Sequence, residues 1–270
     1  MRSRTIAAMA LGTTALLALT GCGPDAKTAS GPSSSPSPGA TDGKLDSLPE
    51  NEILDRAAAA MDNLQSVHVT GGLPYAADKT AASGSTSVKV DISFDRKGNC
   101  SGTIQAEGLG SVTVIRSPEL LHIKGDADFW RNIARQRHAT PKQENALVGT
   151  FAARWMKMPR SNPQSSQMAA VCDQMDAVTG IGASAVEVRK DGISLIDGKT
   201  TVAVSAKTSE GTEETYWIAT QGTPYFLKAL SSGGKDGEVA YSAFDAPVDT
   251  APPAGADVLD LSKAGAGEGS

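Results

Sequence analysis

The spacing of apolar residues changes partway along the chain, and this change limits the folds that the sequence can adopt. Between residues 50 and 64, apolar side chains recur at the three- and four-residue intervals of a helix, at Ile53, Leu54, Ala57, Met61 and Leu64. From Val88 to Asp95 they instead alternate with polar residues, which is typical of a strand with one apolar face and one wet face. The chain therefore combines an amphipathic helix with half-buried strands.

The same two patterns recur along the rest of the chain. The alternation continues at 104–106, 112–114 and 121–123, and returns at 154–157, 185–189, 192–196, 200–206, 214–220, 225–231 and 238–244. Hairpin turns are expected at 190–192 and 233–237, short helices around 128–137 and from 140, and a second clear helix at 164–178. Ser47, followed by Pro49 and Glu50, is expected to cap the first helix. About ten antiparallel strands with helices between them predict an α+β fold, in which a curved sheet wraps its helices.

The N-terminus has the features of an export signal. Arg2 and Arg4 precede an uncharged segment at 7–20, which is too short to span a bilayer comfortably. The segment ends in Leu19-Thr20-Gly21-Cys22, which resembles the bacterial lipobox. The resemblance implies cleavage before Cys22 and a diacylglycerol on its thiol; the alternative is an ordinary signal peptide with a chance cysteine.

The composition divides the chain into four expected regions. A signal peptide at 1–21 is followed by a Ser/Pro/Gly-rich disordered tether at 22–46, a single folded domain at 47–262 and a polar tail at 263–270. As a flexible chain, a tether of ~25 residues spans roughly 25–30 Å. Cleavage would remove two arginines and take the net charge from −5 to −7. Such a chain gains no electrostatic attraction from nucleic acid, so we expect no binding to DNA or RNA.

Two further cysteines lie within the expected domain. Cys100 has the strand parity of Ile104, and Cys172 lies on the apolar side of the second predicted helix, so both side chains should point into the core. In an oxidising compartment, this predicts a Cys100–Cys172 disulfide, with two separate buried thiols as the alternative. The chain has no C-x-x-C pair and no HExxH or GxSxG motif, and its three histidines are far apart. We therefore predict no catalytic residues, no metal site and no cofactor.

Several segments together resemble a known family. They are the lipobox at Cys22, the helix ENEILDRAAAAMDNLQSVHVTG, the segments LLHIKGDADFWRN and RWMKMP, and the C-terminal run from Glu214 to Pro253. This set resembles actinobacterial lipoproteins of the LppX/LprG type, whose fold is similar to LolA and LolB. The resemblance implies a half-barrel of antiparallel strands closed by helices, with an apolar cavity that takes acylated lipids or glycolipids. The Cys100–Cys172 pair is a departure from the mycobacterial members.

These observations predict a monomeric lipoprotein, anchored to the extracytoplasmic face of the cell membrane through Cys22. Aromatic residues make up 4% of the chain and the inward positions are mostly small, so a lipid or glycolipid could fit beneath the sheet. The residues expected to line that cavity are Met61, Leu64, Val90, Ile92 and Phe94. The alternative is a non-enzymatic interaction or sensor lipoprotein with a filled core, and an unrecognised hydrolase is a third reading.

Overall fold

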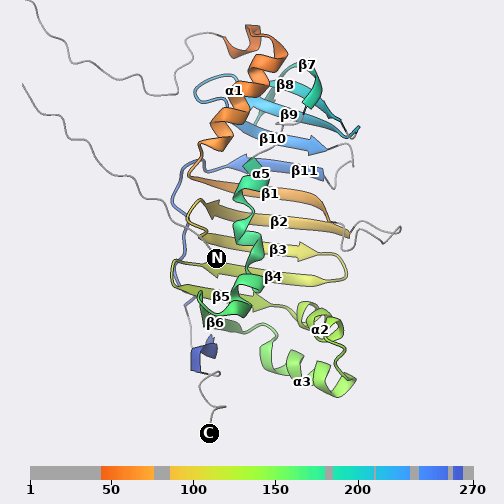
Figure 1. Ribbon diagram of the computed structural model, residues 1–270, viewed down its shortest axis with the longest axis vertical. Coiled ribbons are helices and arrows are strands. Elements are labelled where there is room, and N and C mark those ends of the chain that lie inside the picture. Colours follow the sequence, from red (N-terminus) through yellow and green to blue (C-terminus); the bar gives the residue numbers. More distant parts are fainter. Residues whose placement is uncertain are drawn as a thin grey trace, which may run out of the picture. The chain divides into compact units, whose positions relative to one another are not determined.

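The computed structural model describes residues 44–75, 86–179, 185–209, 211–231, 237–254 and 258–263, all within one compact unit, Gly39–Ser270. In these residues, 12 strands form one sheet in the order β12-β6-β5-β4-β3-β2-β1-β11-β10-β9-β8-β7 (Figure 1). Their bounds are β1 Ser66–Tyr75, β2 Thr86–Asp95, β3 Cys100–Ala106, β4 Gly110–Arg116, β5 Leu120–Gly125, β6 Trp155–Pro159, β7 Ala185–Ile196, β8 Lys199–Thr208, β9 Glu213–Ala219, β10 Phe226–Ser231, β11 Glu238–Ser242 and β12 Val258–Asp260. The sheet is open, with β12 and β7 at its edges.

Most neighbouring strands are also neighbours in the sequence. Strands β1 to β6 form one antiparallel series and β7 to β11 a second, and the two series join where β1 pairs with β11. The exception to the antiparallel rule is β12, which pairs in parallel with β6. The expected α+β class, with a curved sheet around helices, is confirmed.

Five α-helices lie in the described residues. They are α1 (Glu50–Asp62), α2 (Ala127–Gln136), α3 (Pro141–Phe151), α4 (Pro163–Met168) and α5 (Met175–Thr179). Figure 1 shows α1 beside the β7–β11 half of the sheet, α4 to α5 across β1 to β5, and α2 with α3 near the ends of β4 and β5. No helix among the described residues is both long enough and apolar enough to cross a membrane.

One face of the sheet carries the core, and we call it the inner face. Cross-strand partners share a face, so the register places Val69, Ile92, Val114 and Ile123 in one buried row that continues through Gly102. A Cβ atom on Gly102 would overlap the backbone of β2, so glycine lets these strands approach closely. The predicted alternation from Val88 to Phe94 is confirmed, because Val90, Ile92 and Phe94 are buried.

Two helix predictions are wrong in detail. Ser47 does not cap α1, because a 3-10 turn at Leu45–Ser47 directs its hydroxyl to the Lys44 carbonyl, and Pro49 takes the N-cap position. Leu45 is buried, so the folded residues begin earlier than residue 47.

The expected continuous helix at 164–178 is broken into α4, a 3-10 turn at Ala170–Asp173, and α5. The break lies at a contact with the sheet, where Arg116 on β4 donates a hydrogen bond to the carbonyl of Ala169.

The predicted turn at 190–192 is also wrong. Lys190 to Gly192 belong to β7, where the pairing register shifts by one residue against β8, and Gly192 has a φ of 130°. This is a β-bulge, which a sequence pattern does not separate from a turn because both favour glycine. The hairpin lies instead at Asp197 and Gly198, both with positive φ. Residues 232–236, most of the other expected turn, lie outside the described residues.

Candidate functional site

The five predicted lining residues all lie in one hydrophobic core. Met61 is near the end of α1 and Leu64 just beyond it, while Val90, Ile92 and Phe94 share the inner face of β2. Arg96, in the turn after β2, donates from Nε to the Leu64 carbonyl at 2.5 Å, which fixes the end of the helix beside this strand. The structure therefore brings the five into one apolar environment.

A segment that we call the strap, residues 163–179, covers the inner face between β1 and β5 (Figure 1). It consists of two short helices and a 3-10 turn rather than one long helix. The expected disulfide is present and joins Cys172 on the strap to Cys100 on β3. Arg96 also pairs with Asp176 at 2.9 Å. The cysteine pair predicted from strand parity therefore attaches the strap to the sheet.

A buried arginine provides the second attachment. Arg116 occupies the inner face of β4, where its side chain is only 4% exposed, and it pairs with Asp173 next to the disulfide. It also donates to the carbonyls of Gly98 and Ala169. The hydrogen bond from Arg116 lowers the pKa of Asp173 and outweighs the opposing effect of burial. Sequence reasoning missed this pair, although a charged residue at an inward strand position was a signal.

A small polar group interrupts the inner face on the other half of the sheet. Tyr216 on β9 is buried, stacks on Phe226 at a ring distance of 4.8 Å, and donates its hydroxyl to Glu214. Burial, then the hydrogen bond to Glu214, raises the pKa of Tyr216. Burial, then the Glu214 charge, also raises that of Tyr241 on β11. This cluster, Glu214–Tyr216–Tyr241, places hydrogen-bonding groups beside an otherwise apolar face.

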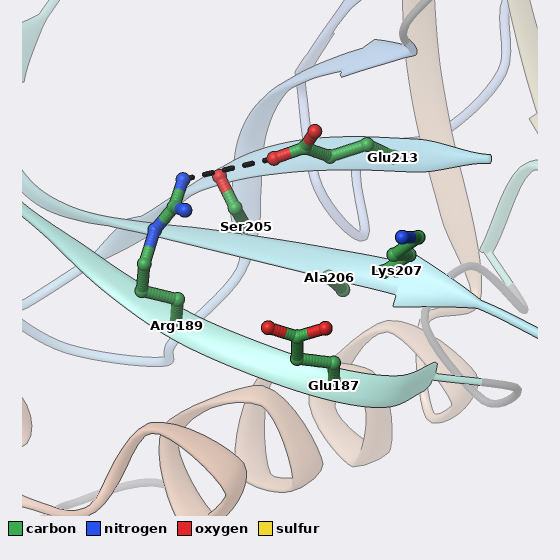
Figure 2. Close-up of a pocket in the computed structure, with 6 residues that line it drawn as sticks. All are labelled: Glu187, Arg189, Ser205, Ala206, Lys207 and Glu213. Carbon is green, nitrogen blue, oxygen red and sulfur yellow. Dashed lines mark ion pairs between the residues drawn. The ribbon is translucent and has the colours of Figure 1, made fainter. Parts of the chain in front are cut away.

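Two hollows are polar and open to the surface. One has a volume of about 210 Å³ and lies on β7 to β9. The residues that line it are drawn in Figure 2: Glu187, Arg189, Ser205, Ala206, Lys207 and Glu213. Arg189 is paired within the protein, because it contacts Glu213 at 3.6 Å and Asp191 at 2.7 Å. The other hollow, of about 280 Å³, lies beside the strap and is lined by Asp95, Arg96, Gly98, Cys172, Asp173, Met175 and Asp176. Neither resembles an apolar ligand pocket.

The network behind the first hollow holds the bulge of β7 in place. Ser205 donates to the Asp191 carboxylate, as does Arg189. Burial raises the pKa of Asp191, but these two hydrogen bonds outweigh it, so the pKa is lowered. The Asp191 carboxylate in turn raises the pKa of Arg189. No group of three or more His, Cys, Asp or Glu residues suited to a metal occurs in the described part of the chain.

Comparison with known proteins gives structural neighbours only. No family model matches the chain, and no curated protein does. Among solved structures, LprF from Mycobacterium bovis has 17% identity and a TM-score of 0.46, covering 76% of this chain and 97% of that one. Lipoprotein LppX from Mycobacterium tuberculosis has 14% identity and a TM-score of 0.44, covering 75% and 100%. MucB has 14% identity and a TM-score of 0.33, covering 77% and 63%.

Proposed function

We propose that this chain is a lipoprotein, anchored at Cys22 on the extracytoplasmic face of the membrane, that binds acyl chains against the inner face of its sheet. The observation that carries the proposal is the contrast between this broad apolar face and its thin cover. Between β1 and β5, the cover is a strap of short helical turns, joined to the sheet by one disulfide and by the ion pairs Arg116–Asp173 and Arg96–Asp176.

The chemistry of the inner face suits a lipid. An acyl chain has no hydrogen-bonding groups, so it needs a continuous apolar surface, and the row from Val69 to Ile123 provides one across four strands and Gly102. The Glu214–Tyr216–Tyr241 cluster lies beside this surface, and its oxygen atoms would accept hydrogen bonds from the hydroxyl groups of a glycerol or a sugar. We infer that an amphipathic ligand would place its polar end there.

The lipobox supports the anchor and the location. The run Leu19-Thr20-Gly21-Cys22 follows a short apolar segment, and residues 23–44 are mainly Ser, Pro, Gly, Thr and Ala. A single acyl chain binds a membrane only marginally, whereas a diacylglycerol has two. The proposed anchor would therefore keep the folded domain at the membrane from which it draws lipid.

Two substitutions test the proposed ligand site. Ala57→Phe and Val90→Trp place large side chains at buried inner positions, and Ala59→Phe on the exposed side of α1 is the matched control. If an acyl chain occupies this space, both variants should melt nearly as the wild type does and lose uptake of a fluorescent acyl lipid. Overpacking a filled core typically costs 1–3 kcal/mol instead.

The outcomes separate the two readings of the inner face. Strong destabilisation with no lipid uptake by the wild type would favour a filled core and an interaction or sensor role. Stable variants that still take up lipid would place the ligand elsewhere. Native mass spectrometry of the protein purified from its own membrane should show bound lipid, and its absence together with absent uptake would contradict the proposal.

A further inference from the structure

The exposed large hydrophobic side chains of the described residues are gathered on one strand. Val186, Ile193 and Leu195, which are 67%, 55% and 69% exposed, all belong to β7. Single exposed apolar residues are normal on a protein surface, whereas neighbouring ones on the same face are a candidate contact surface. Ile193 and Leu195 lie together next to the Asp197–Gly198 turn, and Val186 lies at the opposite end of the strand. We call the segment from Ile193 to Gly198 the β7 tip.

The β7 tip continues the inner face beyond its helical cover. Ile193 pairs with Val202 and Leu195 with Thr200, and cross-strand partners point to the same side of a sheet. Val202 is a fully buried core residue, so Ile193 lies on the core side. The inner face is therefore covered by protein at Val202 on β8, whereas it is exposed at Ile193 on the edge strand β7.

The N-terminal segment enters the fold beside this edge. Lys190, on the same strand, donates from Nζ to the carbonyls of Asp46 at 2.8 Å and Leu48 at 2.7 Å. These contacts hold the start of the folded residues against β7, and Figure 1 shows the beginning of α1 and β7 at the same end of the sheet. Lys44, the first residue that the structure describes, lies 22 positions after Cys22 in the sequence, so an anchor at Cys22 would be joined to the fold through this end.

The free edge of β7 is poorly suited to pairing with another strand. Its register against β8 shifts twice, between Ala185 and Glu187 and between Lys190 and Gly192. It also carries the exposed charges of Glu187, Arg189 and Asp191. Bulges and charges are the usual protection of a sheet edge against strand addition. The exposed apolar residues at the tip are therefore not explained by a partner strand.

We propose that the β7 tip docks into the extracytoplasmic leaflet of the membrane, with Ile193 and Leu195 among the lipid acyl chains. The proposal rests on the lipid anchor of the proposed function and adds an orientation to it. The Arg189–Asp191–Ser205 network on one side and Lys190 on the other attach the strand behind the tip to the rest of the fold. Docking in this orientation would let an acyl chain pass from the leaflet onto the inner face without crossing water.

Spin labels on two lysines of β8 test the docking directly. Lys199 adjoins the tip and Lys207 lies near the other end of the same strand, and both are exposed. The acylated mature protein would carry Lys199→Cys or Lys207→Cys, with a nitroxide attached, in vesicles of phosphatidylcholine and phosphatidylglycerol in equal parts. The label at 199 should gain accessibility to oxygen and lose it to a water-soluble nickel complex, while the label at 207 stays in water. Equal exposure of the two labels to water would overturn the proposal.

A paired substitution tests the role of the apolar side chains. Ile193→Asp with Leu195→Asp should abolish immersion of the label at 199 and slow pickup of a fluorescent acyl lipid from vesicles by about tenfold or more. Binding of the same lipid delivered from detergent should not change. Val186→Asp is the matched control on β7 and should leave both measurements as in the wild type.

The remaining outcomes of these experiments separate membrane docking from the alternatives. An equal effect of Val186→Asp, or a dimer in sedimentation that the paired substitution dissolves, would contradict membrane docking and favour a general apolar contact or a second copy. Immersion of the label at 199 in a protein that binds no lipid would refute the proposed lipid binding and leave docking intact. All variants lie at exposed positions, and their melting temperatures check that the fold is retained.

Discussion

Removal of the Cys100–Cys172 disulfide should detach the strap before it unfolds the sheet. The two cysteines are 72 residues apart, and the loop-entropy model gives about 4 kcal/mol for a loop of this length, as an upper value. The other attachments differ in strength. Asp176 is 90% exposed, so its pair with Arg96 adds little. Arg116 is buried and should keep part of the strap in place.

The variant is Cys100→Ala with Cys172→Ala, because a single substitution would leave a free thiol. For a domain of this size, 1 kcal/mol corresponds to about 2–4 °C, so the melting temperature should fall by up to about 8–16 °C. Hydrogen exchange should localise the loss. Amides at 163–179 should exchange faster than in the oxidised protein, while those of β2 to β4 keep most of their protection.

Two results would refute this reasoning. An unchanged melting temperature would mean that the bridge does not constrain the chain in solution. Equal loss of protection in the strap and in β2 to β4 would mean that the two unfold as one unit, so that the strap is a part of the core and not a separable cover. Reduction of the wild-type protein with dithiothreitol is the control and should reproduce the behaviour of the double variant.

Two further predictions concern charge and anchoring. Asp173→Asn should lower the free energy of unfolding by about 1–2 kcal/mol, because the buried Arg116 loses its counter-charge, while the exposure of Asp173 limits the effect. The pKa of Asp173 is lower in the folded state than in the unfolded chain. Its contribution to the free energy of unfolding is therefore fully present above about pH 4 and is lost as the pH falls through the folded-state pKa. Acid denaturation of the wild type and of Asp173→Asn would show this, because their difference in stability should disappear at low pH. Cys22→Ser should leave the protein unprocessed or release it from the membrane fraction; unchanged fractionation with a normal mature N-terminus would contradict the lipobox.

The sequence predicted those elements whose pattern has a local cause. Alternation identifies β2 because one of its faces is buried, and the spacing from Ile53 to Leu64 identifies α1 for the same reason. The break in the strap was not predicted. It lies where Arg116, about 50 residues earlier in the sequence, contacts the Ala169 carbonyl, and this contact exists only in the fold. Strand β12 was missed because three residues are too few to show alternation of apolar and polar side chains. Its partner β6 also lies about 100 residues earlier in the sequence.

Part of the candidate site was also predictable from the sequence. Sequence parity placed Val90, Ile92 and Phe94 on the inner side of a strand, and they are there. Parity alone does not separate a core residue from a cavity wall, because both require an apolar side chain pointing inward. The two polar features of the inner face were missed for different reasons. Asp173 reaches Arg116 only when the strap is in place, whereas Glu214 and Tyr216 are two residues apart on β9 and the sequence does not show that Tyr216 is buried.

The order of the strands also determines how the chain can reach this structure. Each of the two antiparallel series consists of neighbours in the sequence, so each can form from short-range contacts. Their junction is different, because pairing of His68 with Ser242 closes a loop of about 170 residues. Until that step, β1 and β11 are both free edges with apolar inner faces, which makes the interval before they meet the period in which the folding chain is most exposed to aggregation.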